Sequence, residues 1–119
     1  MLFRSAAINW DSFNLAAGET IAFHQPGRES VTLNRVTGSQ ASTIAGRVTA
    51  NGQVILVNQN GVLFTQGARV DVGSLIATTA DLGTAEFLSG GLNFRRASLN
   101  HDAMVVNRGV INEIGRAHV

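Results

Sequence analysis

Hydrolysis or elimination of sugar chains needs carboxylates that converge on one face with a base or a second carboxylate. The 119-residue sequence has eight acidic side chains, spread along its length: Asp11, Glu19, Glu29, Asp71, Asp81, Glu86, Asp102 and Glu113. One histidine stands next to an acid, at His101–Asp102, but neighbouring side chains on a strand point to opposite faces. We therefore expect no catalytic residues and no enzymatic activity.

The remaining reactive side chains predict neither a metal site nor a cofactor. Cysteine is absent, which excludes disulfides, thiolate metal ligands and a cysteine nucleophile. The three histidines show no metal-ligand spacing with one another or with a carboxylate. We expect no metal, no cofactor and no small-molecule substrate.

The charge pattern argues against a nucleic-acid partner. All nine basic residues are arginines scattered along the chain, and the formal net charge is +1. Nucleic-acid binding usually requires a clustered basic face, often with aromatic residues between the charges. Tyrosine is absent and Trp10 is the single tryptophan. A carbohydrate-binding module would also require exposed aromatic residues, whereas the six phenylalanines lie in apolar patterns typical of a core.

The chain that must position any site is predicted to be one all-β domain. Hydrophobic residues make up 45% and charged residues 14%, which is too apolar for a disordered chain. Strand-length apolar runs alternate with glycines through the middle of the sequence, at Gly46, Gly52, Gly61, Gly67, Gly73 and Gly83. Only Thr84 to Gly90 could form a helix, of one turn, with Thr84 as its N-cap.

One polar element stands out between two apolar runs. In "VILVNQNGVLF", Val54 to Phe64, the four residues Asn58-Gln59-Asn60-Gly61 predict a turn, with a positive φ at Gly61. "MVVNRGVIN", Met104 to Asn112, repeats the plan. Such repeats favour stacked coils in which asparagines at corresponding corners form a ladder. Asn-Gly is also the strongest hairpin signal, so an antiparallel sandwich is the alternative.

The ordered motifs between Ile8 and Phe87 resemble a known family. They are "INWDSFNLAAGETIAFHQP", "LNRVTG", "STIAGRVTANGQVILVNQNGVLF" and "GARVDVGSLIATTADL". Together they resemble the secretion domain of two-partner-secretion exoproteins, the filamentous-haemagglutinin and high-molecular-weight-adhesin family of Gram-negative bacteria. The signature Asn-Pro-Asn-Gly of this family appears here as Asn58-Gln59-Asn60-Gly61, with glutamine in place of proline. Asn34-Arg35 is a second motif match.

The resemblance implies a right-handed parallel β-helix with some extra-helical strands. It implies an export signal, not an enzyme, that the periplasmic domains of an outer-membrane β-barrel transporter recognise. The passenger that follows, an adhesin or a cytolysin, is secreted or reaches the cell surface through the periplasm and binds host or neighbouring cells. The motif residues Asn34, Arg35, Asn58, Gln59, Asn60 and Gly61 are the candidate partner-binding set. A polysaccharide-active enzyme on a parallel β-helix, or a carbohydrate-binding module, is the alternative.

Both ends of the sequence carry expectations of their own. Because the family's domain starts upstream with a signal peptide and further strands, residues 1–112 are expected to be a secretion domain truncated at its N-terminus. Trp10 and Phe13 are expected to cover the open end of the solenoid, where unpaired backbone favours self-association. "EIGRAHV", Glu113 to Val119, breaks the strand pattern and matches a translated sequencing adapter, so it is expected to be a non-native tail.

Overall fold

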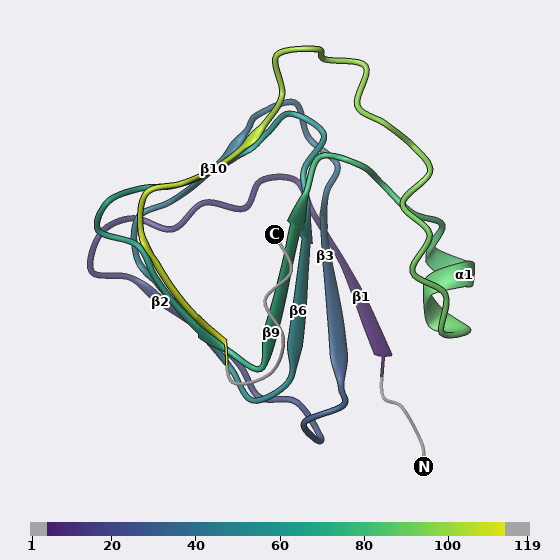
Figure 1. Cartoon of the computed structure of the whole chain (residues 1–119), viewed down its shortest axis with the longest axis horizontal. Helices are drawn as coiled ribbons and strands as arrows, with labels where there is room; N and C mark the ends of the chain where they lie inside the picture. The colour runs from purple at the N-terminus through teal and green to yellow at the C-terminus, as the bar shows by residue number, and fades with distance from the viewer. Residues whose placement is uncertain (1–4, 114–119) are drawn as a thin grey trace.

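The computed structural model describes residues 5–113 and shows a chain wound into a coil with three walls (Figure 1). Each wall is a parallel β-sheet, and each coil adds one strand to each sheet, except that the first coil contributes only a single parallel bridge, Leu15–Ile44, to one of the walls. The winding is right-handed, as crossovers between parallel strands almost always are. The predicted right-handed parallel β-helix is confirmed.

The three sheets, named A, B and C, have short strands in regular order. In their spatial order, sheet A contains β1 (Ser5–Trp10), β3 (Val31–Val36), β6 (Gln53–Val57) and β9 (Ser74–Thr78). Sheet B contains β4 (Ser42–Ile44), β7 (Val62–Phe64) and β10 (Val105–Asn107). Sheet C contains β2 (Thr20–Phe23), β5 (Arg47–Ala50), β8 (Arg69–Val72) and β11 (Val110–Glu113).

The parallel pairing contradicts the antiparallel alternative. Within residues 5–113, every pair of neighbouring named strands is parallel, including β3 with β6 and β6 with β9. The Asn58–Gly61 turn therefore does not close a hairpin. It bends the chain from β6 in sheet A to β7, which pairs with β4 and β10 in sheet B.

Two apolar clusters hold the coils together. The larger cluster fills the lumen, where residues such as Ile44, Leu56, Phe64 and Val70 from all three sheets meet. The smaller cluster lies on the outer face of sheet A, where Leu33, Ile55 and Val57 pack against Leu82 and Phe87. Sheet A is thus buried on both faces, which explains the nearly continuous apolar run in β6.

The second cluster is covered by a segment that leaves the solenoid between β9 and β10. This excursion, residues 79–104, carries helix α1 (Thr84–Leu88) and one antiparallel bridge, Asp81–Arg96. The described part of the chain has one other isolated bridge, the parallel pair Leu15–Ile44, which extends sheet B. No helix in residues 5–113 has the length and apolar character needed to cross a bilayer.

The predicted N-cap of this helix is wrong by one residue. Gly83 is the N-cap, with an extended backbone (φ −69°, ψ 133°), and its carbonyl accepts a hydrogen bond from the Phe87 N–H. The Thr84 hydroxyl instead accepts a hydrogen bond from Arg35 Nη1 at 2.7 Å. The contact with Arg35 thus holds the side chain that was expected to cap the helix.

Trp10 and Phe13 lie at the first coil, as expected. Their rings form an edge-to-face pair with centroids 5.1 Å apart, and both pack on the luminal cluster. The Trp10 Nε1–H donates to Asn34 Oδ1 at 3.0 Å. The first coil is therefore fixed to the second by a polar contact inside an apolar lumen.

The outer face of sheet C is polar, in contrast to sheet A. Asp71 accepts hydrogen bonds there from Asn112, Arg69 and Arg47. The amide of Asn112 and then the guanidinium of Arg69 lower the pKa of Asp71 below its ordinary value. These contacts link β5, β8 and β11 across three coils. Because this face is polar, it can remain exposed to solvent.

The last described strand reaches into the predicted tail. Glu113 ends β11, and its carboxylate accepts a hydrogen bond from the Leu75 N–H at 2.8 Å. The strand pattern therefore extends one residue beyond the predicted break at Asn112. The rest of the predicted tail, residues 114–119, lies outside the described residues, and its non-native origin stays a prediction.

Candidate recognition site at the Asn58–Gly61 corner

The corner between β6 and β7, residues 58–61, is organised around a fully buried asparagine. The side chain of Asn58 donates from Nδ2 to the Gln40 carbonyl at 3.0 Å and to Ser42 Oγ at 2.9 Å. Its Oδ1 accepts from the backbone and side-chain nitrogens of Asn60, both at 2.9 Å. Asn58 therefore fixes its own turn and ties it to the coil below.

Asn60 makes the second connection to that coil. Its Nδ2 donates to the Gly38 carbonyl at 2.9 Å, in addition to its contact with Asn58. Asn60 remains partly exposed. The two asparagines together hold the segment 38–42, which is the corresponding corner of the preceding coil.

Gly61 has the backbone conformation that the sequence predicts. Its φ is +116°, a region that side chains rarely adopt. A Cβ at this position would also lie 3.2 Å from the Met104 carbonyl oxygen. Its own carbonyl accepts from the Ser42 N–H at 3.0 Å. The positive φ of the turn therefore favours glycine at this position, and the segment just before β10 leaves little room for a side chain.

Gln59, which replaces the usual proline, contacts the excursion. Its Nε2 donates to the Arg96 carbonyl at 2.9 Å, and its own carbonyl accepts from Ser98 Oγ. Sequence reasoning did not identify Arg96 or Ser98, because they lie far along the chain in a segment without a motif. The one available signal was the glutamine itself, which adds a hydrogen-bonding side chain where proline has none.

The second motif lies on two faces of the same strand. Asn34 is fully buried in the lumen, with Nδ2 donating to the Ile55 carbonyl at 3.3 Å. Arg35 points outward and binds the start of the excursion: Nε contacts Asp81 Oδ1 at 2.8 Å and Nη2 donates to the Leu82 carbonyl at 2.6 Å. Its side chain is only 14% exposed. Arg35 therefore anchors the outgoing leg of the excursion, and Gln59 anchors its return leg.

The expected asparagine ladder is wrong. Asn107 pairs with Phe64, and not with the corner of Asn58, because Val105–Asn107 lies on β7 in sheet B. Its Oδ1 accepts from the Gly109 N–H at 2.9 Å within its own turn. The two asparagines occupy different corners of the coil, one between sheets A and B and one between sheets B and C.

The charged residues weighed for catalysis lie apart. Asp71 is on the outer face of sheet C, whereas Asp81 is paired with Arg35 beside sheet A. Among residues 5–113, no three histidine or acidic side chains are close enough together to hold a metal ion. No buried side-chain nitrogen or oxygen in this range lacks a hydrogen-bond partner. The polar groups of the two motifs are therefore used within the domain.

The comparisons with known proteins agree with this geometry. A model of the TPS secretion domain, where TPS denotes two-partner secretion, matches residues 4–118. The chain belongs to the TPS secretion domain family. This family comprises the secretion domains of exoproteins that pass through the periplasm to the surface or medium with a partner outer-membrane transporter. It is a family of export domains and is not known for enzymes.

The structural match supports the fold assignment. The crystal structure of the HMW1 secretion domain from Haemophilus influenzae superimposes with a TM-score of 0.84 at 32% identity, covering 92% of this chain and 30% of that one. The predicted family and the β-helix are both confirmed by this comparison.

The curated relatives are much longer proteins. Two heme/hemopexin-binding proteins of Haemophilus influenzae are 44% identical over 109 residues and 42% identical over 105 residues. These matches cover 92% and 88% of this chain, but only 12% and 11% of the relatives. The similarity therefore concerns the TPS domain and leaves most of each relative outside the comparison.

Proposed function

We propose that this domain is the N-terminal export signal of a longer exoprotein, and that the periplasmic domains of an outer-membrane β-barrel transporter recognise it. TPS domains interact with a partner outer-membrane transporter, and this supports the proposal. The observation that carries the proposal is the convergence at residues 58–61, which bind the preceding corner through Asn58 and Asn60 and the excursion through Gln59. The partner then recognises a surface whose shape this corner fixes.

The second motif supports the same surface from the other side. Arg35 fixes the outgoing leg of the excursion with an ion pair and two further hydrogen bonds. Charge-assisted hydrogen bonds of this kind are about twice as strong as neutral ones. Inside the lumen, Asn34 accepts the hydrogen bond of the Trp10 indole N–H. Because Asn34 and Asn58 are fully buried, we assign direct contact with the transporter to Gln59 and Asn60 and a supporting role to the other motif residues.

The activity delivered to the cell surface belongs to the passenger. An adhesin that binds host or neighbouring cells is the first candidate, from the resemblance to the adhesin family. A heme- or hemopexin-binding passenger is the second candidate, and the names of the curated relatives at 44% and 42% identity favour it. Replacing the native passenger with a reporter and measuring its release would isolate the export function from either activity.

The test measures binding of the chain to purified transporter and to its periplasmic domains alone. Asn60→Ala is compared with Asn112→Ala, which removes an amide from the outer face of sheet C. We expect Asn60→Ala to weaken binding at a temperature where both variants are folded, and Asn112→Ala to bind like the parent. Absence of binding by the parent would overturn the proposed function. Equal binding by the parent and both variants would remove Asn60 from the recognised surface.

A further inference from the structure

The loop that returns the excursion to the solenoid carries a solvent-exposed apolar side chain. We call residues 96–104 the apical loop. Leu99 is 96% exposed and Met104, at the end of the loop, is 61% exposed. Four of the six exposed large hydrophobic residues in the described part of the chain lie on the excursion: Leu88, Leu92, Leu99 and Met104. A single exposed leucine is common. Whether Leu99 has a role therefore depends on how rigidly the loop holds it.

The base of the apical loop is fixed by hydrogen bonds to the corner. Ser98 Oγ donates to the Gln59 carbonyl and accepts from the Asn100 N–H at 3.1 Å. The carbonyl of Arg96 accepts from Gln59 Nε2. The residue before Leu99 and the residue after it are therefore both held in place.

The far side of the loop is fixed as well. Asn100 Oδ1 accepts from the Asp102 N–H at 3.0 Å, and the Asn100 carbonyl accepts from the Ala103 N–H at 3.1 Å. The Met104 carbonyl accepts from the Val62 N–H at 3.0 Å. A side chain presented on such an ordered loop loses little conformational entropy when a partner binds it.

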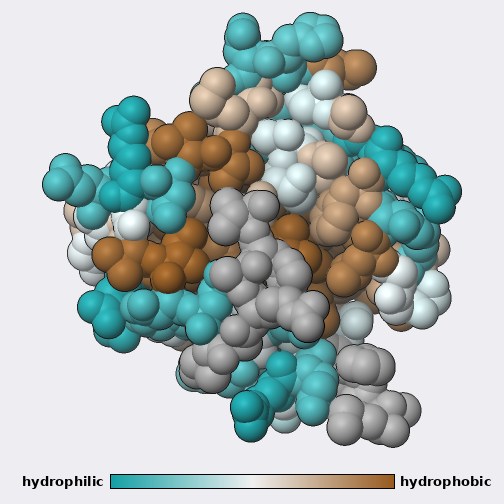
Figure 2. Space-filling view, in the orientation of Figure 1, coloured by the Kyte–Doolittle hydropathy of each residue, from teal (hydrophilic) through white to brown (hydrophobic). Residues whose placement is uncertain are grey.

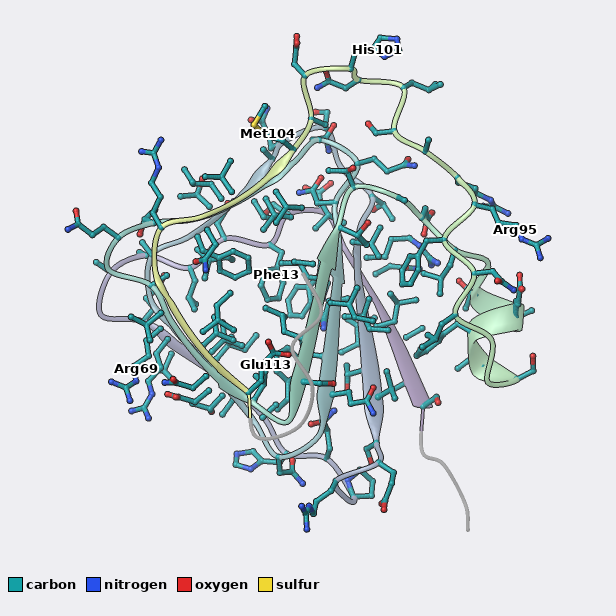
Figure 3. All side chains as sticks on the ribbon, viewed as in Figure 1. Phe13, Arg69, Arg95, His101, Met104 and Glu113 are labelled. Carbon is teal, nitrogen blue, oxygen red and sulfur yellow. The ribbon has the colours of Figure 1, made fainter. Side chains whose placement is uncertain are left out.

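The apical loop continues into a groove on the outer face of sheet B. Thr43, Leu63 and Val106 form one row across β4, β7 and β10, and they line the groove together with Asp102 and Met104 from the loop. Figure 3 shows His101 at the tip of the loop and Met104 where it joins β10. Figure 2 shows apolar surface over the side of the molecule where β10 lies.

The rim of the groove indicates the kind of partner. Asp102 and Arg108 both line it together with the apolar Leu63, Met104 and Val106, so the groove combines apolar side chains with charges of both signs. An apolar centre with a mixed polar rim is the usual composition of a protein interface. Nucleic acid or an anionic membrane would instead favour basic residues alone.

We propose that Leu99 is the apolar anchor by which this domain docks on the periplasmic domains of its transporter, with the groove on sheet B as the adjoining contact. The inference rests on the proposed function. It makes Gln59 and Ser98 positioning residues, because their contacts set the direction in which Leu99 projects. It also gives the corner at residues 58–61 a reason to hold the return leg of the excursion.

The experiment compares Leu99→Ser with Leu92→Ser in the full chain. Leu92 is 46% exposed and lies on the excursion outside the apical loop, so it controls for loss of exposed apolar surface. We expect Leu99→Ser to raise the Kd for the periplasmic domains about tenfold or more, as at an interface hot spot. We expect Leu92→Ser and Leu99→Met to bind like the parent, and all variants to keep the parent Tm.

The positioning role has its own readout. Ser98→Ala is expected to weaken binding less than Leu99→Ser and to leave the Tm nearly unchanged. In the variant that carries both substitutions, the loss of binding free energy should be smaller than the sum of the two single losses. Once Leu99 is replaced, a change in the direction of the loop has no anchor to displace. Fully additive losses would overturn the positioning role of Ser98.

Failure of the inference and failure of the proposed function give different results. If the parent binds and Leu99→Ser binds equally well, the anchor is overturned while the proposed function stands. If the parent does not bind, both are overturned. If Leu99→Ser binds the transporter like the parent but loses affinity for vesicles of phosphatidylethanolamine and phosphatidylglycerol, the loop is a membrane contact and the docking inference is overturned.

Discussion

Asn58 and Asn107 both end a short apolar run and precede a glycine, at Gly61 and Gly109. Asn58 is fully buried and donates two hydrogen bonds to the corresponding corner of the preceding coil, residues 38–42, whereas Asn107 is exposed and bonds its own turn. The surroundings cause this difference. The first corner lies between the preceding coil and the excursion, and the second lies on the last described coil. The same residue types therefore build a connecting hub in one place and a local turn in the other.

The two glycines are required for different reasons. Gly61 adopts a positive φ of +116°. At Gly109 a Cβ would lie 2.6 Å from the Ala68 carbonyl oxygen, so close approach of the preceding coil is what excludes a side chain. Sequence similarity between the corners thus reflects steric demand at the glycines and not a shared role of the asparagines.

The largest expected effect is that of Gly61→Val. A β-branched residue at this φ costs about 1–3 kcal/mol in backbone strain, and the added side chain also presses on the Met104 carbonyl. We expect a clear loss of stability in urea unfolding and a parallel loss of secretion. The control is Gly67→Val. Gly67 is exposed and is not among the glycines with positive φ, and a Cβ added there would lie 3.6 Å from the Ala45 carbonyl oxygen, an ordinary contact. Equal stability of the two variants would contradict the turn assignment.

The comparison sharpens with Asn58→Ala and Asn107→Ala. Removing the Asn58 amide takes its donor from the Ser42 hydroxyl and its acceptor from the Asn60 N–H, and leaves the Gln40 carbonyl with the 3.4 Å contact from Asn60 Nδ2. We expect a cost of about 1–3 kcal/mol for these buried groups. Removing the Asn107 amide exposes one turn N–H to water, and should cost within about 0.5 kcal/mol. Urea unfolding measures both. A similar loss in the two variants would mean that the second corner contributes as much as the first.

The fold was largely predictable because its signals are local. The glycines and short apolar runs predicted short strands, and the ordered motifs from Ile8 to Phe87 predicted the family. Gly61 was assigned its positive φ from the turn alone. These features depend on a few adjacent residues, whose allowed conformations are set by sterics.

The role of the site was not predictable in the same way. Asn34 and Asn58 were candidates for partner contact, but their burial follows from how coils stack. The contact of Gln59 with Arg96 joins residues far apart in sequence. Stacking also decides that Asn107 faces Phe64 and not Asn58. The register between coils depends on how many residues each corner contains. A sequence pattern does not give that number, so it does not predict which residues of successive coils pair.

The smallest expected effect is that of Gln59→Pro, which restores the family's usual residue. Proline stiffens the unfolded chain and stabilises by about 0.4–1 kcal/mol where the native φ is compatible. Within residues 5–113 the Gln59 N–H donates to no protein group, so the proline ring removes no backbone hydrogen bond. The glutamine side chain, however, loses its exposed hydrogen bond to the Arg96 carbonyl, and a typical hydrogen bond contributes about 0.5–1.5 kcal/mol.

These two terms nearly cancel, so we expect the stability of Gln59→Pro to lie within about 0.5 kcal/mol of the parent. Gln59→Ala separates them, because it loses the bond to Arg96 without stiffening the chain. Urea unfolding should therefore place Gln59→Pro about 0.4–1 kcal/mol above Gln59→Ala. Hydrogen exchange at the Asp81 N–H, which also donates to the Arg96 carbonyl, should be faster than in the parent in both variants. If exchange stays slow in both, Gln59 does not hold the return leg of the excursion, and the corner at residues 58–61 acts on the preceding coil alone.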